Sequence, residues 1–164
     1  MEIAGLVVGL ASLYVAIGFE DVLLQLVFGL VAWSAVLFFS HCLTHYVVGT
    51  ILGIRFQYYM VTRTPLRKLA LPIVSPLAGH VPLLAIKTDP RSLRSASSTR
   101  RAIMFASGTV ASISLPFLLA AEAYFTLTPT AWSILLTMSI LNLVFTLYFS
   151  PKVGDLSRAV ESLR

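Results

Sequence analysis

The run VLLQLVFGLVAWSAVLFFS (Val22–Ser40) decides the fold, and it passes directly into His41-Cys42-Leu43-Thr44-His45. A bilayer core of about 30 Å needs roughly 20 consecutive apolar residues in a helix, and this uncharged run has that length. The pattern predicts a membrane-spanning helix over 22–40 that continues to about Ile54. Histidines four residues apart lie one above the other on one helix face, so this helix carries a polar pair in an apolar setting.

The composition of the whole chain is that of a membrane protein. Of its 164 residues, 57% are hydrophobic and 12% are charged, and the mean hydropathy is +0.87, whereas soluble domains carry about 25% charged residues. Further apolar segments predict spans at 3–18, 102–124 and 131–149, and Pro116 interrupts the span at 102–124. We therefore expect an all-α polytopic membrane protein with about four transmembrane helices in one integral membrane domain, 1–164.

The ends of the chain carry little further information. Met1-Glu2-Ile3 has no positive region, and no small-residue cleavage site follows the first apolar segment, so we expect a retained helix rather than a signal peptide. The single cysteine allows no internal disulfide.

Charge predicts the orientation in the membrane. All 12 Lys and Arg residues lie in the loop 55–101 or the tail 150–164. The positive-inside rule places both segments in the cytoplasm. An even number of spans, four, then places the N-terminus in the cytoplasm as well. We expect the membrane to be the plasma membrane of a prokaryote. The net charge of +5 is then a topology signal, with anionic lipid headgroups rather than nucleic acid as the partner of the basic loop.

The loop 55–101 contains short segments with strand character. Phe56–Val61 is aromatic and β-prone, and Val81–Ile86 is a second extended candidate. The Pro-rich stretch 69–77 is expected to be interfacial or re-entrant, because its prolines disfavour a spanning helix. We expect a short β-like or re-entrant cytoplasmic segment between the second and third helices.

The two histidines have the spacing of the zincin motif H-E-x-x-H, in which both bind a metal. A tetrahedral catalytic zinc site with one open position needs a third protein ligand. Asp155, in Gly154-Asp155-Leu156, is the candidate, because the second and fourth spans run in the same direction and bring it to the membrane level of His41 and His45. The sequence therefore predicts one divalent metal, most simply zinc, bound by His41, His45 and Asp155.

Two alternatives for these residues stay open. The Asp155 carboxylate could instead cap a terminal helix over 156–164. The histidines could instead belong to a hydrogen-bonded packing cluster with Thr44 and Tyr46.

The order of these motifs resembles the site-2-protease class of intramembrane zinc metallopeptidases, especially its small zincin-peptidase relatives. The histidine motif and the late aspartate motif are two of the matching pieces. A third is Leu52-Gly53-Ile54-Arg55-Phe56, which resembles the stretch before the family's short β-segment. A fourth is Ala106-Ser107-Gly108-Thr109-Val110-Ala111-Ser112, which resembles the family's A-x-G-P-x-A-N. The resemblance covers about Ser40 to the C-terminus. It implies a substrate cleft lined by Gly108, Thr109 and Ser112, and it implies proteolysis as the activity. An extended segment of another membrane protein is expected to bind there by strand pairing beside Phe56–Val61.

The chain departs from the family pattern at the catalytic position. Cys42 stands where the family has the glutamate that activates the attacking water, and Thr109 and Ser112 replace a proline and an asparagine. A thiol, with an intrinsic pKa near 8.5, is a poor general base and binds metals readily. Three outcomes are open: a pseudopeptidase, a metal-binding protein in which Cys42 joins the metal shell, or an enzyme carrying an engineered change. His80 could approach the metal as a second-shell residue, although a structural role fits it better.

We therefore expect a zinc-binding homologue of these peptidases that is a pseudopeptidase or a weakened peptidase acting on membrane-protein segments. The alternative is a non-enzymatic small subunit of a larger membrane complex, in which the histidines are packing residues. A small transporter or channel fits less well, because four short spans provide no acidic relay. Metal content separates the first two functions.

Overall fold

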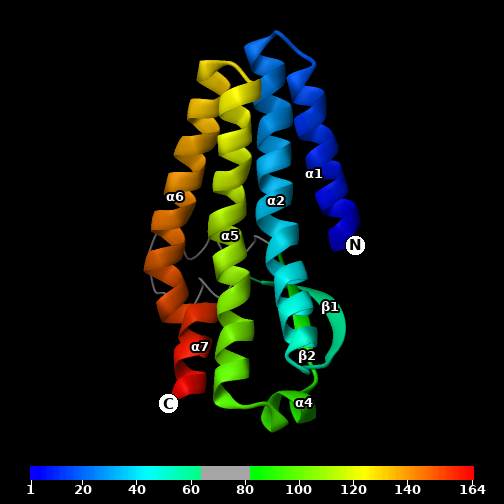
Figure 1. The fold of residues 1–164 in the computed structure, drawn as a ribbon, viewed down its shortest axis with the longest axis vertical. Coiled ribbons are helices and arrows are strands. Elements are labelled where there is room, and N and C mark those ends of the chain that lie inside the picture. Colours follow the sequence, from blue (N-terminus) through cyan, green and yellow to red (C-terminus); the bar gives the residue numbers. More distant parts are fainter. Residues whose placement is uncertain (64–81) are drawn as a thin grey trace. The chain divides into compact units, whose positions relative to one another are not determined.

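The computed structural model describes residues 1–63 and 82–164 (Figure 1). The elements are α1 (Glu2–Ile17), α2 (Val22–Ile51), β1 (Phe56–Arg63), β2 (Pro82–Thr88), α4 (Pro90–Ser95), α5 (Ser98–Thr126), α6 (Pro129–Val153) and α7 (Asp155–Leu163). The Pro-rich stretch 69–77 and His80 lie outside the described residues.

The described chain is mostly helical, as the sequence predicts. The helices α2, α5 and α6 are long and apolar enough to cross a membrane, whereas α1 is an apolar helix of only 16 residues. Membrane insertion through three helices is thus consistent with the fold. A fourth span and the cytoplasmic placement of the termini stay predictions.

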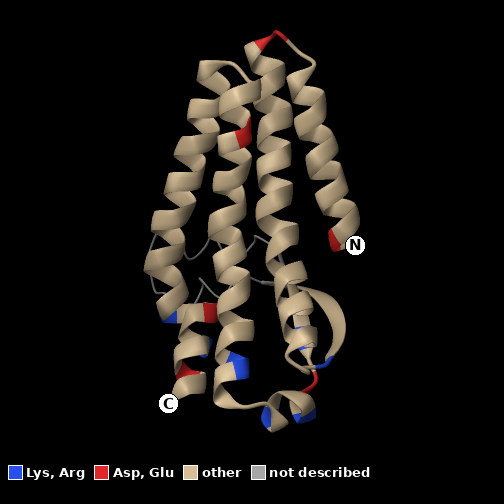
Figure 2. Cartoon of the chain, viewed as in Figure 1, with Lys and Arg blue, Asp and Glu red and all other residues tan. Residues whose placement is uncertain are grey.

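The first of two compact units comprises Met1–Leu43 and Val110–Thr146. Its core is apolar and is shared by α1 and parts of α2, α5 and α6: Leu13, Ala16, Ala32, Trp33, Val36, Leu119, Ala120, Ala123, Leu127, Ala131 and Leu135. Gly5 faces the ring of Phe39 and Gly9 faces Ala35, with no room for a Cβ at either glycine. The G-x-x-x-G spacing thus lets α1 pack closely on α2. This unit contains no Lys or Arg (Figure 2).

A buried polar contact joins three helices of this unit. The indole Nε1 of Trp33 donates to the hydroxyl of Ser139 at 3.0 Å, and that hydroxyl lies 3.1 Å from the carbonyl oxygen of Pro116 and 2.9 Å from that of Leu135. Ser139 is fully buried. Polar groups in a span need internal partners, and here they connect α2, α5 and α6. The helix α5 continues through Pro116, so the predicted interruption leaves one helix rather than two.

The second unit comprises Thr44–Thr109 and Leu147–Arg164. Within it, β1 and β2 pair antiparallel, with Tyr59 opposite Ile86 and an irregularity between Phe56 and Tyr58. Both predicted β-like segments therefore form strands: β1 ends two residues after the predicted 56–61, and β2 ends two residues after the predicted 81–86. The ring of Tyr46 on α2 lies 5.5 Å from that of Phe56 and 6.3 Å from that of Tyr59, so aromatic contacts hold the sheet against the last turns of α2.

The end of α2 is a tightly bonded turn. Gly53 has a φ of 80°, and the amides of Gly53 and Ile54 donate to the carbonyls of Thr50 and Gly49, which is the glycine-terminated pattern that closes many helices. The helix therefore stops at Ile51 rather than running to Ile54. The hydroxyl of Ser92 accepts from the amide of Arg55 at 2.7 Å and lies 3.3 Å from the carbonyl oxygen of Gly53, so α4 braces this turn.

Candidate metal centre

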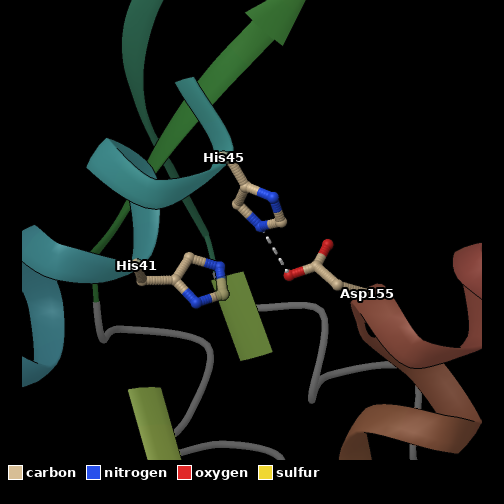
Figure 3. A group of neighbouring side chains, drawn as sticks. All are labelled: His41, His45 and Asp155. Atoms are coloured by element: carbon tan, nitrogen blue, oxygen red, sulfur yellow. Dashed lines mark hydrogen bonds and ion pairs between the residues drawn. The ribbon is translucent and has the colours of Figure 1, made fainter. Parts of the chain in front are cut away.

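His45 is held in one orientation by a backbone carbonyl. Its Nδ1 lies 2.7 Å from the carbonyl oxygen of Met104 on α5, and its side chain is only 8% exposed. A carbonyl oxygen can only accept, so Nδ1 carries the proton and donates. The other ring nitrogen, Nε2, lies 3.2 Å from Oδ2 of Asp155 (Figure 3).

This orientation places two acceptors against each other. With the proton on Nδ1, a neutral imidazole presents a lone pair at Nε2, and the carboxylate oxygen of Asp155 also presents lone pairs. Two such atoms at this distance can both bind one cation. A metal-binding histidine whose other nitrogen donates to a carbonyl is the common arrangement at metal sites.

Asp155 begins α7, and the turn before it directs its carboxylate. Gly154, and not Asp155, is the N-cap of α7. The hydroxyl of Ser150 accepts from the amide of Leu156 at 3.2 Å, so this side chain provides a capping bond. The predicted alternative, in which the Asp155 carboxylate serves as the cap, is therefore wrong. The carboxylate instead lies against His45, and the exposed guanidinium of Arg158 lies 3.8 Å from its second oxygen.

His41 lies one helical turn before His45 on α2. Its Nδ1 is 2.8 Å from the hydroxyl oxygen of Ser112. The ligand atoms of His41, His45 and Asp155 all lie within 4.8 Å of one another (Figure 3). Ligand atoms about 2.1 Å from a tetrahedral zinc are about 3.4 Å apart. His45 Nε2 and Asp155 Oδ2, 3.2 Å apart, have about that spacing, so these two atoms are close enough to bind one ion.

The residues predicted to line a cleft are buried, and two of them contact the histidines. Gly108 faces the imidazole of His45, and a Cβ there would overlap the ring. The hydroxyl of Thr109 lies 3.4 Å from that of Ser150, and the hydroxyl of Ser112 contacts His41. Each therefore has a packing or hydrogen-bonding role, and the lining of a substrate cleft stays a prediction.

Cys42 is separate from the ligand group. Its side chain is 1% exposed, and within the described ranges the group comprises the two histidines and Asp155 without the thiol. The helix turns by about 100° per residue, so Cys42 projects to one side of the face that carries His41. The structure gives no support for Cys42 as a metal ligand.

Sequence reasoning missed two groups that contact the ligands. The carbonyl of Met104 has no sequence signal, because every residue has a backbone carbonyl. Arg158 did have a signal, because a basic residue three positions after Asp155 on a helix lies on the same face. The positive-inside pattern uses Arg158 only as a marker of membrane orientation.

Replacing Gly108 with alanine is expected to weaken metal binding about 10- to 100-fold. The added methyl would occupy the place of the His45 ring, and displaced orienting contacts typically have this effect on affinity. Alanine favours helix over glycine, so α5 itself should not be weakened. The measurement is a zinc competition titration on the purified protein.

The matched control is Gly29→Ala in α2, where the nearest neighbours of the added methyl are the flexible methyl groups of Leu135, at 3.3 Å or more. This variant should bind zinc as the parent does. Equal affinities for the Gly108 variant and the parent would contradict the packing of Gly108 on His45.

Comparisons of the chain with protein-family models, with curated proteins and with solved structures found no match, so the residues of this centre carry the functional interpretation.

Proposed function

We propose that this chain binds one divalent metal ion, most simply Zn²⁺, through His41, His45 and Asp155. The observation that carries the proposal is the orientation of His45. Its Nδ1 donates to Met104 and its Nε2 lies 3.2 Å from a carboxylate oxygen. A metal ion between these two atoms would be bound by both of them.

The donor set favours zinc over the harder cations. Two imidazoles and one carboxylate are ligands that zinc binds in catalytic sites with three protein ligands, whereas magnesium and calcium prefer sites made of oxygen atoms. Three protein ligands leave a fourth position for a small molecule or a substrate oxygen. A metal ion held by these three residues would act as a Lewis acid and polarise a carbonyl group bound at the fourth position.

The chain is proposed to be a site-2-protease-like pseudopeptidase or weakened peptidase. A general base must lie within hydrogen-bonding reach of the proton that it removes. Cys42 occupies the motif position of that base but lies outside the ligand group, and Asp155 is the one carboxylate in the group among the described residues. As a metal ligand, Asp155 is not free to shuttle protons. Binding without efficient cleavage is the function that this arrangement supports best.

The proposed ligand is an extended segment of another membrane protein. The sheet of the second unit contains two strands among the described residues, and an extended peptide can add to the outer edge of a strand through backbone hydrogen bonds. Tyr46 packs on the sheet one residue after His45, so a peptide along β1 would lie near the helix that carries the metal ligands.

The test is the metal content of the purified protein. After expression without tags that bind metal and dialysis against metal-free buffer, elemental analysis should find about one zinc per chain. Cys42→Ser should keep the same content, because the thiol is not a ligand. A chain that retains no zinc and binds none on titration would contradict the proposal and favour the alternative, a small non-enzymatic subunit of a membrane complex.

A further inference from the structure

Pro116 leaves a backbone acceptor without its usual helical donor. Proline has no N–H, so the carbonyl four residues earlier, that of Ser112, receives no hydrogen bond from position 116. Asn142 on α6 supplies the donor instead, because its Nδ2 lies 2.7 Å from the Ser112 carbonyl oxygen. The hydroxyl of Thr146, one turn later on α6, lies 3.4 Å from Oδ1 of Asn142. All of these residues belong to the first unit.

The hydroxyl of Ser112 contacts a side chain on another helix rather than a carbonyl of its own helix. Ser114 and Thr137 bond back to the carbonyl four residues earlier in their own helix, which is the ordinary outcome for such side chains. The hydroxyl of Ser112 instead lies 2.8 Å from Nδ1 of His41 on α2. The same residue is therefore held by α6 through its carbonyl and contacts a candidate metal ligand through its side chain.

We propose that Asn142 is a positioning residue for His41. By fixing the backbone of Ser112, it fixes the hydroxyl that lies 2.8 Å from Nδ1 of His41, and this contact sets the orientation of that imidazole. Such orienting partners of metal-binding histidines typically change metal affinity 10- to 100-fold. This inference rests on the proposed metal centre.

A neighbouring contact provides the matched comparison. Ser139, one turn before Asn142 on α6, also donates to a carbonyl of α5 near the proline, that of Pro116. Its other contacts are with Trp33 and Leu135, and neither of these is a candidate ligand. Loss of α5–α6 bonding in general can therefore be separated from loss of the contact that reaches His41.

The experiment is a Co²⁺ titration of the purified full chain in detergent, followed by the visible d–d absorption of the bound ion. Asn142→Leu should lower Co²⁺ affinity 10- to 100-fold and change the absorption spectrum, while Ser139→Ala should bind Co²⁺ as the parent does. Ser112→Ala should reproduce the loss. Because Asn142 acts through Ser112, the double variant should bind no more weakly than Ser112→Ala alone. If Asn142→Leu does not fold, as judged by thermal unfolding, Ser112→Ala carries the test.

The outcomes separate the two proposals. A parent chain that binds no Co²⁺ overturns the proposed function itself. A parent that binds Co²⁺, with both Asn142→Leu and Ser112→Ala within twofold of it, overturns only the positioning role. An equal loss in Ser139→Ala, or additive losses in the double variant, would show a general packing effect and would also overturn it.

Discussion

Replacing His45 with alanine is expected to remove stoichiometric zinc binding. Structural zinc sites with four ligands bind with about 10–16 kcal/mol, so one ligand corresponds to about 3 kcal/mol, or at least about a hundredfold in affinity. His45 should show the full effect, because its 8% exposed side chain makes both the Met104 and the Asp155 contacts. Isothermal titration with zinc, together with elemental analysis, measures the loss.

Thermal unfolding provides a second measure of the same site. Zinc at about a thousand times its Kd should stabilise the parent by about 4 kcal/mol, and this stabilisation should disappear in His45→Ala. Gly29→Ala, whose added methyl meets only flexible leucine methyl groups, is the control and should be stabilised by zinc as the parent is. Zinc that stabilises His45→Ala as much as the parent would refute the assigned ligand.

Replacing Cys42 with glutamate is expected to create or raise peptidase activity by about 10²- to 10⁴-fold. This is the usual effect of a positioned general base, and position 42 is where the zincin motif places that base. The parent should cleave single-span model substrates negligibly, because the ligand group of the described chain contains no carboxylate besides Asp155. Product formation from labelled peptides in nanodiscs, with zinc loaded, gives the rates.

Two variants control this comparison. Cys42→Gln introduces a side chain of similar size without a basic carboxylate and should stay inactive, and Asp155→Asn in the glutamate background should lose zinc and activity together. Chelator-sensitive cleavage by the parent at the rate of the glutamate variant would show that a different residue is the base. A folded, zinc-loaded glutamate variant that cleaves nothing would show that the chain has no productive substrate cleft.

The helices were predictable because hydropathy is a one-dimensional signal, but their ends were not. The predicted third and fourth spans, 102–124 and 131–149, are shorter than α5 (Ser98–Thr126) and α6 (Pro129–Val153). Hydropathy marks the apolar stretch, whereas a helix continues into polar residues as long as its backbone bonds are made. Where α5 continues through Pro116, the Ser112 carbonyl accepts from Asn142 on another helix, and no local pattern reveals that bond.

The candidate ligands were predictable from spacing and topology, but their surroundings were not. The i, i+4 histidines and the late aspartate follow from motif order and from spans that run in the same direction. The tautomer of His45 depends on the carbonyl of Met104, and the space for its ring depends on Gly108. The tautomer and the space for the ring both depend on how α2 packs against α5, so they cannot be predicted from the residue types alone.

Asp155 and His45 are separated by 110 positions along the chain, and this separation has a consequence for biosynthesis. While the ribosome is still producing α5 and α6, both histidines are already present and the carboxylate that completes the centre has not yet been made. If the chain binds metal as proposed, stable capture is expected only after α6 and α7 have been made. Metal occupancy in cells would then report on completed membrane assembly, and chains stalled during insertion would remain metal-poor.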